Sequence, residues 1–299
     1  FQTQTSIHII KGGISMKFKG AKLGVVLIVM GLMAVVITVG GCSRIQPTPV
    51  QPTAEPLSGK VTFAGSTTVQ PLAAALGQAF NETYPNVTLD IAAGGSSVGI
   101  KAIHDGTVDI GMASRTLSEE EADGIETHKI AVDVLAVVVH PDNPVDDLTY
   151  DQLAAVYRGE ILNWKELGGP DAGIVAGIRE TTSGTRKAFD KLVLGGENPA
   201  APEIETCMTN GDVVALVKDT PTSIGYIGFG YLQEGLKSLS IDGVEATQEN
   251  AVNASYTLMR PLQLLTGPLS QPLADSFIEF ALSEEGQALV SESGWIAAN

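Results

Sequence analysis

Three loops of this chain are rich in small hydroxyl residues, and each lies where a strand pattern gives way to a helix pattern. They contain Thr67, Ser96 and Ser183. The start of a helix carries backbone N–H groups without helical partners and the positive end of the helix dipole. Together with hydroxyl groups, these donors can hold an oxyanion such as phosphate.

The loop from Arg179 to Arg186 has the fullest set of such groups. It reads Arg-Glu-Thr-Thr-Ser-Gly-Thr-Arg, so that Gly184 allows close approach of the backbone and Arg179 stands at the end of the preceding strand. A guanidinium can bind an oxyanion through two parallel hydrogen bonds. A Ser or Thr at this place can also be only a helix cap, so the loop taken alone leaves both interpretations open.

The three loops and one further strand end supply the candidate ligand-binding residues. The set favours a binding protein without a metal or cofactor, because it holds no nucleophile–base pair and no cluster of metal ligands. The main candidates are Thr67, Thr68, Ser96, Ser114, Arg179, Ser183, Gly184 and Thr185, and further candidates are Ser66, Ser97 and Arg115.

An enzymatic alternative comes from Gly95 to Gly99, which match the G-x-S-x-G pattern of serine hydrolases with Ser97 in the nucleophile position. That reaction needs a histidine later in the chain, and the mature part offers only His104, His128 and His140. No HGGG-like oxyanion segment precedes Ser97. A secreted serine hydrolase therefore stays a distant alternative.

Strand and helix patterns alternate along the chain, which predicts an α/β protein with mostly parallel sheets flanked by helices. In such sheets, ligands gather at the carboxyl ends of the strands, where all three hydroxyl loops lie. We expect strands at 60–64, 87–92, 108–112, 130–139, 223–228 and 255–265, and helices at 69–84, 150–157, 186–194, 212–218, 272–282 and 284–291, with a short helix after Ser118.

The first 41 residues are interpreted as an upstream extension and a signal peptide that begins at Met16. A basic stretch precedes the apolar run 23–39, and Val39-Gly-Gly-Cys42 resembles the lipobox of bacterial-type lipoproteins, in which the cysteine is lipidated. Residues 42–57 would form a Pro-rich tether. An uncleaved anchor helix is the alternative. Both interpretations place the remaining chain outside the cytoplasmic membrane.

The formal net charge is −16, and removal of the four leader lysines leaves 14 basic against 34 acidic residues, 14 − 34 = −20. This balance argues against nucleic acid or an anionic membrane surface as a partner, and leaves a lipid anchor as the only membrane contact. An anion must then be captured by local hydrogen bonds in a cleft. Salt screens the repulsion from distant surface charges, whereas it does not screen these short contacts.

Seven segments, taken in order, resemble the phosphate-binding proteins of phosphate-specific ABC transporters, a family of periplasmic substrate-binding proteins. The resemblance begins near Gly59 and reaches the C-terminus. The segments are 65–72, 94–101, 108–115, 161–165, 179–186, 223–227 and 260–262.

This resemblance implies a two-lobed periplasmic-binding-protein fold of type II with a two-strand hinge. Lobe 1 would comprise 58–137 plus 262–299, and lobe 2 would comprise 138–261. It also implies a monomeric receptor that captures inorganic phosphate between the lobes and delivers it to an ABC transporter permease. A binder or sensor for arsenate, sulfate, molybdate or tungstate is the alternative.

The resemblance implies that the eight main candidates bind the phosphate. At one of these positions the chain differs from the family pattern. Where well-known members have an aspartate that accepts the phosphate proton and rejects sulfate, this chain has Ser114, followed by Arg115. A serine accepts a hydrogen bond but carries no charge that repels sulfate. Arg115 is expected at the edge of the site or paired with a nearby acid.

Overall fold

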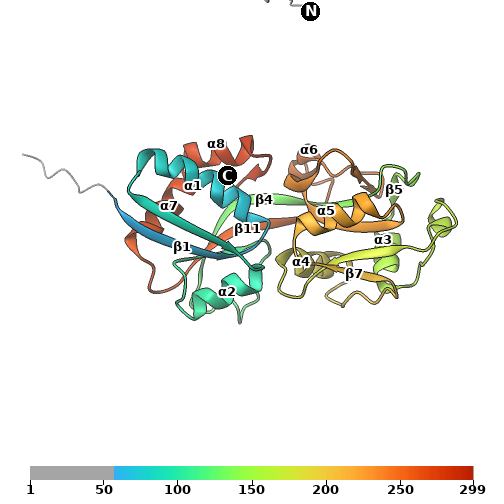
Figure 1. Cartoon of the computed structure of the whole chain (residues 1–299), viewed down its shortest axis with the longest axis horizontal. Helices are drawn as coiled ribbons and strands as arrows, with labels where there is room; N and C mark the ends of the chain where they lie inside the picture. Colours follow the sequence, from blue (N-terminus) through green and yellow to red (C-terminus); the bar gives the residue numbers. More distant parts are fainter. Residues whose placement is uncertain (1–56, 299) are drawn as a thin grey trace, which may run out of the picture. The chain divides into compact units, whose positions relative to one another are not determined.

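One sheet of ten strands runs through the part of the chain that the computed structural model describes, residues 57–298 (Figure 1). The main strand order is β2-β1-β3-β11-β4-β8-β6-β7, and β9 and β12 pair with β4. Helices pack on the sheet, so the expected α/β class is confirmed. The predicted signal peptide, the lipobox Cys42 and the tether up to residue 56 lie outside the described residues.

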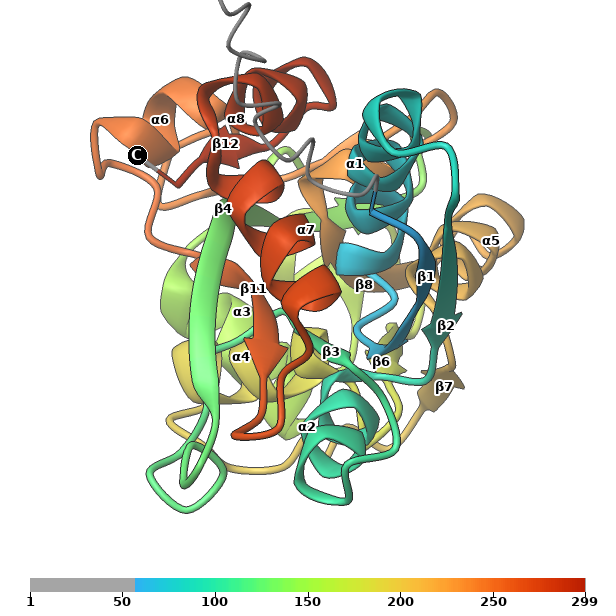
Figure 2. The same cartoon turned by 90° about the vertical axis from the view of Figure 1, so that its left-hand side faces the viewer.

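The first half of the sheet has parallel strands in the order β2-β1-β3. Helices α1, α7 and α8 share a core with one face of these strands, while α2 packs with Ala113 and Leu265 in a separate cluster (Figure 2). The elements are β1 (Gly59–Gly65), α1 (Val69–Thr83), β2 (Val87–Ala93), α2 (Ser96–His104), β3 (Ile110–Ala113), α7 (Pro272–Leu282), α8 (Glu284–Glu292) and β12 (Ile296–Ala297).

The second half has parallel strands in the order β8-β6-β7 and a core of its own. In this core Phe189 stacks on Tyr226 with ring centroids 3.9 Å apart, which fixes helix α4 against the sheet. The elements are β5 (Asp147–Leu148), α3 (Tyr150–Arg158), η1 (Trp164–Leu167), β6 (Val175–Arg179), α4 (Gly184–Val193), β7 (Ile204–Cys207), α5 (Asn210–Asp219), β8 (Ser223–Gly228), η2 (Phe229–Tyr231), β9 (Lys237–Ser238), β10 (Ser240–Ile241) and α6 (Gln248–Val252).

Strands β4 (Glu126–Val139) and β11 (Met259–Thr266) join the two halves. Strand β4 pairs antiparallel with β11 as far as Val134 and with β8 from Leu135 onward. The buried side chains of β4 change from the first core to the second over the same few residues. The long apolar strand seen in the sequence is therefore the shared element of both half-sheets.

Local signals explain most helix boundaries. Thr149 and Gln152 form the expected reciprocal capping box of α3, and Gly159 ends that helix in a left-handed conformation. The prediction of a short helix after Ser118 is wrong. Ser118 and Glu121 do exchange their capping hydrogen bonds, but the chain makes only a turn before it enters β4.

Close backbone packing places helix α2 at the end of β1. A Cβ atom on Gly99 would lie 2.5 Å from the carbonyl oxygen of Ala64, so only glycine permits this approach. The N-terminus of α2 is thereby held beside the loop that follows β1. Among the helices within residues 57–298, none combines the length and apolar character required to cross a membrane.

Candidate functional site

The three hydroxyl loops meet at the junction of the two half-sheets. Each follows a strand that belongs to a parallel pair, namely β1, β2 and β6, and each precedes a helix, so the loops lie at the carboxyl ends of their strands as predicted. Almost all candidate polar side chains are buried there. The buried set comprises Ser66, Thr67, Thr68, Ser96, Ser114, Arg115, Arg179, Ser183 and Thr185.

In the first half, the hydroxyl groups of Ser96 and Ser114 are in contact with each other. The backbone N–H of Ser114 donates to Ser96 Oγ at 3.0 Å, and the two hydroxyl oxygens are 3.4 Å apart. Ser66 is turned to its own loop, where its Oγ accepts the N–H groups of Thr68 and Val69. Ser66 therefore satisfies N–H groups of its own loop at the start of helix α1, while Ser96 and Ser114 face the other half.

In the second half, the loop before α4 touches this serine pair directly. Ser183 caps α4 by accepting the N–H of Arg186 at 3.3 Å. A Cβ atom on Gly184 would collide with Ser96 Oγ and lie 2.7 Å from Ser114 Oγ. Only glycine at this position lets the backbone at the start of α4 reach the hydroxyl groups of the first half.

Two further contacts cross between the halves. Thr185 Oγ1 is 3.3 Å from Thr68 Oγ1. The backbone N–H of Ser97 donates to the carbonyl oxygen of Thr182 at 3.0 Å. These contacts bring the loops together in one cluster of donors and acceptors, which we call the hydroxyl cluster. Its members are Thr67, Thr68, Ser96, Ser97, Ser114, Thr182, Ser183, Gly184 and Thr185.

Arg179 is the central cation of this cluster and is fully buried. Its Nε donates to the Cys207 carbonyl oxygen at 3.2 Å, and its Nη2 donates to the Met208 carbonyl oxygen at 2.7 Å and to Thr67 Oγ1 at 3.2 Å. Within residues 57–298, its Nη1 has no hydrogen-bond partner. A buried donor without an acceptor is costly, so this nitrogen marks where an anionic oxygen can bind.

The core of the second half holds Arg179 in place. The Tyr226 hydroxyl accepts the backbone N–H of Arg179 at 3.3 Å, and the ring of Tyr226 belongs to the stack described above. Burial is the main cause that lowers the pKa of Arg179, and the charge of Arg260 adds to it. A guanidinium keeps its proton under such conditions, so Arg179 remains a cation.

A second buried cation, Arg260, was not among the candidates. Arg260 and Asp133 are direct cross-strand partners on β11 and β4, and Arg260 donates from Nε at 3.0 Å and from Nη2 at 2.8 Å to Asp133 Oδ2. The same guanidinium reaches Thr68 Oγ1 at 3.2 Å and Ser114 Oγ at 3.4 Å. Arg260 thus connects the ion pair to the hydroxyl cluster.

The sequence held a signal for this pair, because Asp133 is an acid inside the most apolar strand pattern of the chain. Burial is the main cause that raises the pKa of Asp133, and the charge of Arg260 opposes that rise. The Phe229 N–H donates to the other carboxyl oxygen at 3.1 Å. The carboxyl group is therefore engaged through both of its oxygens.

Two other contributors also escaped sequence reasoning. Asn210 donates from Nδ2 to Thr68 Oγ1 at 3.0 Å and accepts the Gly228 N–H at 3.3 Å. The Tyr231 hydroxyl donates to the Thr67 carbonyl oxygen at 2.7 Å. Both residues come from the second half and orient the first hydroxyl loop. Neither lies in one of the hydroxyl loops, so no sequence signal pointed to them.

Arg115 lies at the edge of the cluster and is paired with an acid. Its two terminal nitrogens donate to the Glu121 carboxylate at 2.6 and 2.8 Å, and Nη2 also approaches Ser97 Oγ at 3.4 Å. The hydrogen bond from Arg115 is the main cause that lowers the pKa of Glu121 to about 2. Lys187 of α4 lies 3.6 Å from the same carboxylate, so Glu121 links the two halves.

Ser97 has no histidine among its hydrogen-bond partners in the described part of the chain. His104 contacts the carbonyl oxygen of Glu121, His128 contacts Thr266 Oγ1, and His140 contacts Asp142. Ser97 instead lies beside Arg115. Within residues 57–298, there is also no group of three or more His, Cys, Asp or Glu side chains that could hold a metal ion.

A family model described as a PBP superfamily domain matches residues 50–285. The phosphate-binding protein PstS of Bacillus subtilis is 35% identical to the chain over 247 residues, which cover 81% of this chain and 82% of that protein. The chain belongs to the phosphate-binding protein family of this superfamily. The expected resemblance to phosphate-binding proteins is thereby confirmed.

Solved structures agree with this assignment. A putative phosphate ABC transporter substrate-binding protein with bound phosphate from Clostridium perfringens is 41% identical, with a TM-score of 0.77, and the match covers 81% of this chain and 100% of that one. An ABC-type phosphate transport receptor from Vibrio cholerae is 32% identical, with a TM-score of 0.69 and coverage of 80% and 100%. The expected periplasmic-binding-protein fold therefore matches that of known relatives.

Removal of one partner of the buried ion pair should destabilise the fold. Asp133→Ala leaves the Arg260 charge buried without its partner, and we expect the free energy of unfolding in urea to fall by about 3–5 kcal/mol. The double substitution Asp133→Leu with Arg260→Met leaves no uncompensated charge and should cost less than Asp133→Ala alone.

The control for this comparison is Asp90→Ala. The Lys60–Asp90 pair has the same 2.8 Å separation as the Arg260–Asp133 pair, but its side chains are 55% and 59% exposed rather than 1% and 0%. An exposed pair contributes about 0–1 kcal/mol. A loss for Asp133→Ala no larger than that for Asp90→Ala would contradict the role given to burial.

The Glu121 ion pair should make part of the stability depend on pH. The pKa of Glu121 is about 2 in the folded chain and 4.5 for the ordinary group, so the unfolded state binds more protons between these values. The stabilisation is complete above about pH 4.5 and is lost as the pH falls toward 2. Because this carboxyl group is partly exposed and screened by solvent, we expect less than about 1 kcal/mol.

Urea titrations of the wild type and of Glu121→Gln at several acidic pH values measure this contribution. The difference in unfolding free energy between them should be largest near neutral pH and should shrink as the pH approaches 2. Glu120→Gln, an exposed neighbour, is the control. A difference that stays constant across the acid range would refute the assignment.

Proposed function

We propose that this chain is an extracytoplasmic receptor that captures inorganic phosphate between its two lobes. The observation that carries this proposal is the buried Arg179, whose Nη1 has no partner within residues 57–298 and whose Nη2 donates to Thr67 of the first hydroxyl loop. One free guanidinium nitrogen together with neutral hydroxyl and backbone donors suits a tetrahedral oxyanion. The phosphate named for the Bacillus and Clostridium relatives supports this choice of anion.

The phosphate contacts would come from both lobes. Thr67, Thr68, Ser96 and Ser114 of lobe 1 would face Arg179, Ser183, Gly184 and Thr185 of lobe 2. The buried Arg260, whose charge is neutralised by Asp133, would orient the Thr68 and Ser114 hydroxyl groups by donating hydrogen bonds to them. Ser97 and Arg115 would lie at the edge of the site, and Ser66 would act by shaping the first loop.

The lobes would consist of residues 58–137 with 262–299 and of residues 138–261, joined by β4 and β11. The contacts of Gly184 with Ser96 and Ser114 support a clamp whose halves meet over the anion. Opening would separate these residues by a change at the two connecting strands. The closed receptor would then deliver phosphate to the permease of an ABC transporter, as expected for a monomeric binding protein without catalytic activity.

The cellular location is the remaining part of the proposal. Lipidation at Cys42 after removal of the signal peptide would anchor the receptor to the outer face of the cell membrane. The Pro-rich tether would keep the lobes near the permease. Labelling with a radioactive fatty acid, compared between wild type and Cys42→Ala, tests this location, since a non-lipidated protein would carry no label in either form.

Arg179→Ala should weaken phosphate binding because it removes the cation aimed at the anion. We expect a loss of about 2–5 kcal/mol in binding free energy, measured by isothermal titration calorimetry with inorganic phosphate. Arg179→Lys should recover only part of this loss, because lysine keeps the charge but lacks the planar fork. Arg158→Ala is the control, since Arg158 forms a surface ion pair with Glu197. An unchanged affinity for Arg179→Ala would place the site elsewhere.

Ser114→Asp should increase the preference for phosphate over sulfate. An added carboxylate can accept the proton of phosphate, whereas sulfate has no proton to donate and would be repelled. We expect sulfate binding to fall at least about tenfold more than phosphate binding, which corresponds to about 1.4 kcal/mol. Ser114→Ala, which adds no charge, should not change the ratio. If Ser114→Asp weakens the binding of phosphate and sulfate equally, then residue 114 does not determine the selectivity between them.

A further inference from the structure

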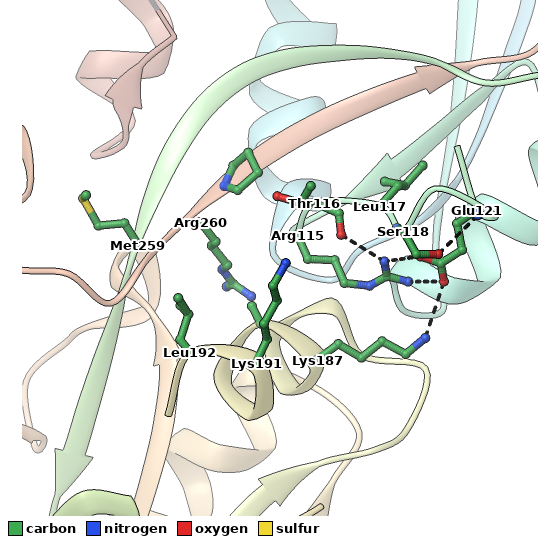
Figure 3. A pocket seen from close by; sticks show the side chains of 12 residues that line it. Arg115, Thr116, Leu117, Ser118, Glu121, Lys187, Lys191, Leu192, Met259 and Arg260 are labelled. Carbon is green, nitrogen blue, oxygen red and sulfur yellow. Dashed lines mark hydrogen bonds and ion pairs between the residues drawn. The ribbon is translucent and has the colours of Figure 1, made fainter. Parts of the chain in front are cut away.

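A hollow lies beside the hydroxyl cluster, between helix α4 and strand β11 (Figure 3). Its volume is about 390 Å³. Figure 3 shows Lys191 extending from α4 toward Arg115 and Arg260, and Lys187 extending from the same helix toward Glu121. Both halves of the molecule therefore contribute to its wall. We call it the α4 pocket.

Positive charge dominates the α4 pocket. Four cations line it, namely Arg115, Lys187, Lys191 and Arg260. Two carboxylates oppose them, since Glu121 lies in the same wall and Asp133 pairs with Arg260. In a chain whose formal net charge is −16, such a local excess favours an anion. In the described part of the chain, Lys191 has no ion-pair partner within 4.0 Å, so its charge is available to a ligand.

Arg115 adds an observation that is independent of the lysines. Its side chain is only 6% exposed, yet its Nε is buried without a hydrogen-bond partner within residues 57–298. The two terminal nitrogens are engaged by Glu121, so the unmet donor is Nε alone. A buried donor without an acceptor is costly, and a ligand oxygen in the pocket can supply the acceptor.

The rest of the wall is largely apolar. Leu117, Ala188, Leu192, Met259 and Pro261 supply its apolar side chains. An inorganic oxyanion would leave most of 390 Å³ unfilled, whereas pockets of about 300–1,000 Å³ hold small organic ligands against mainly apolar walls. The wall therefore suits a molecule with an apolar body and an anionic head.

We propose that the α4 pocket is a binding site for a small organic anion, distinct from the hydroxyl cluster. The anionic head lies against Lys187, Lys191 and Arg115, and the apolar body lies against Leu192 and Met259. Because Arg115 comes from the first half and the lysines come from α4, the ligand bridges the two lobes and favours their closed arrangement. This site goes beyond phosphate capture.

The experiment is a titration of the protein, saturated with inorganic phosphate, with phenyl phosphate and separately with benzoate. Saturation blocks the hydroxyl cluster, so calorimetry and ligand-observed NMR report the second site. We expect both anions to bind with dissociation constants on the order of 1 mM, the range for ligands of this size. Benzyl alcohol, which has the same ring and no charge, should bind at least about tenfold more weakly.

The double variant Lys187→Ala/Lys191→Ala should bind both phenyl phosphate and benzoate at least about tenfold more weakly than the wild type does. Its matched control is Lys101→Ala/Lys165→Ala, which removes two exposed lysines that form ion pairs elsewhere and should change nothing. All four lysines are exposed, so neither variant should impair folding. If neither anion binds, or if the Lys187/Lys191 variant binds as the wild type does, the proposal is overturned.

A titration of the same variants with inorganic phosphate separates the two proposals. The single variant Lys191→Ala is included here, and it should bind inorganic phosphate with wild-type affinity, because Lys191 lies outside the hydroxyl cluster and, unlike Lys187, forms no ion pair across the halves in the described part of the chain. If inorganic phosphate fails to bind any of these proteins, the proposed function fails, and the phenyl phosphate and benzoate titrations still decide the α4 pocket.

Discussion

The buried ion pair between Asp133 and Arg260 is the interaction that holds the site together. It joins the two strands that connect the halves, at the place where β4 changes its partner from β11 to β8. Two opposite charges at this depth are stable only together, because loss of either partner leaves an uncompensated buried charge between the two strands. Arg260 is thereby aimed at Thr68 and Ser114, so one ion pair serves both the junction and the hydroxyl cluster.

An acidic protein that holds an anion must rely on local chemistry. The overall negative charge disfavours approach of an anion, but buried donors act where solvent does not screen them. Most donors of the cluster are neutral hydroxyl and backbone groups. The charged groups are divided: Arg179 keeps a free nitrogen, Arg260 is balanced by Asp133, and Arg115 is balanced by Glu121. Glu180 lies 3.9 Å from Nη2 of Arg179, so all three arginines have an acidic neighbour, and Arg179 contributes its unpaired Nη1 rather than an unbalanced charge.

The parts of the fold and site that follow from local pattern could be predicted. The hydroxyl loops between strands and helices, the apolar strand β4 and the capping box of α3 all depend on neighbours in sequence. The contacts of Asn210 and Tyr231 with the first loop could not, because they join residues 142 and 164 positions apart. The residues after Ser118 predict a helix because their capping pair is that of a helix start, yet the chain forms only a turn there.

The order of residues along the chain settles which chemistry is available: small hydroxyls, helix N-termini and Arg179 at strand ends, in the arrangement typical of phosphate-binding proteins. Which of these groups are free to act is a property of the folded chain alone. In the folded chain, the Ser66 hydroxyl accepts N–H groups of its own loop and Arg115 pairs with Glu121, while one nitrogen of Arg179 has no partner within residues 57–298. The reason is physical, since burial and pairing depend on which distant side chains share a space, and sequence order does not specify that.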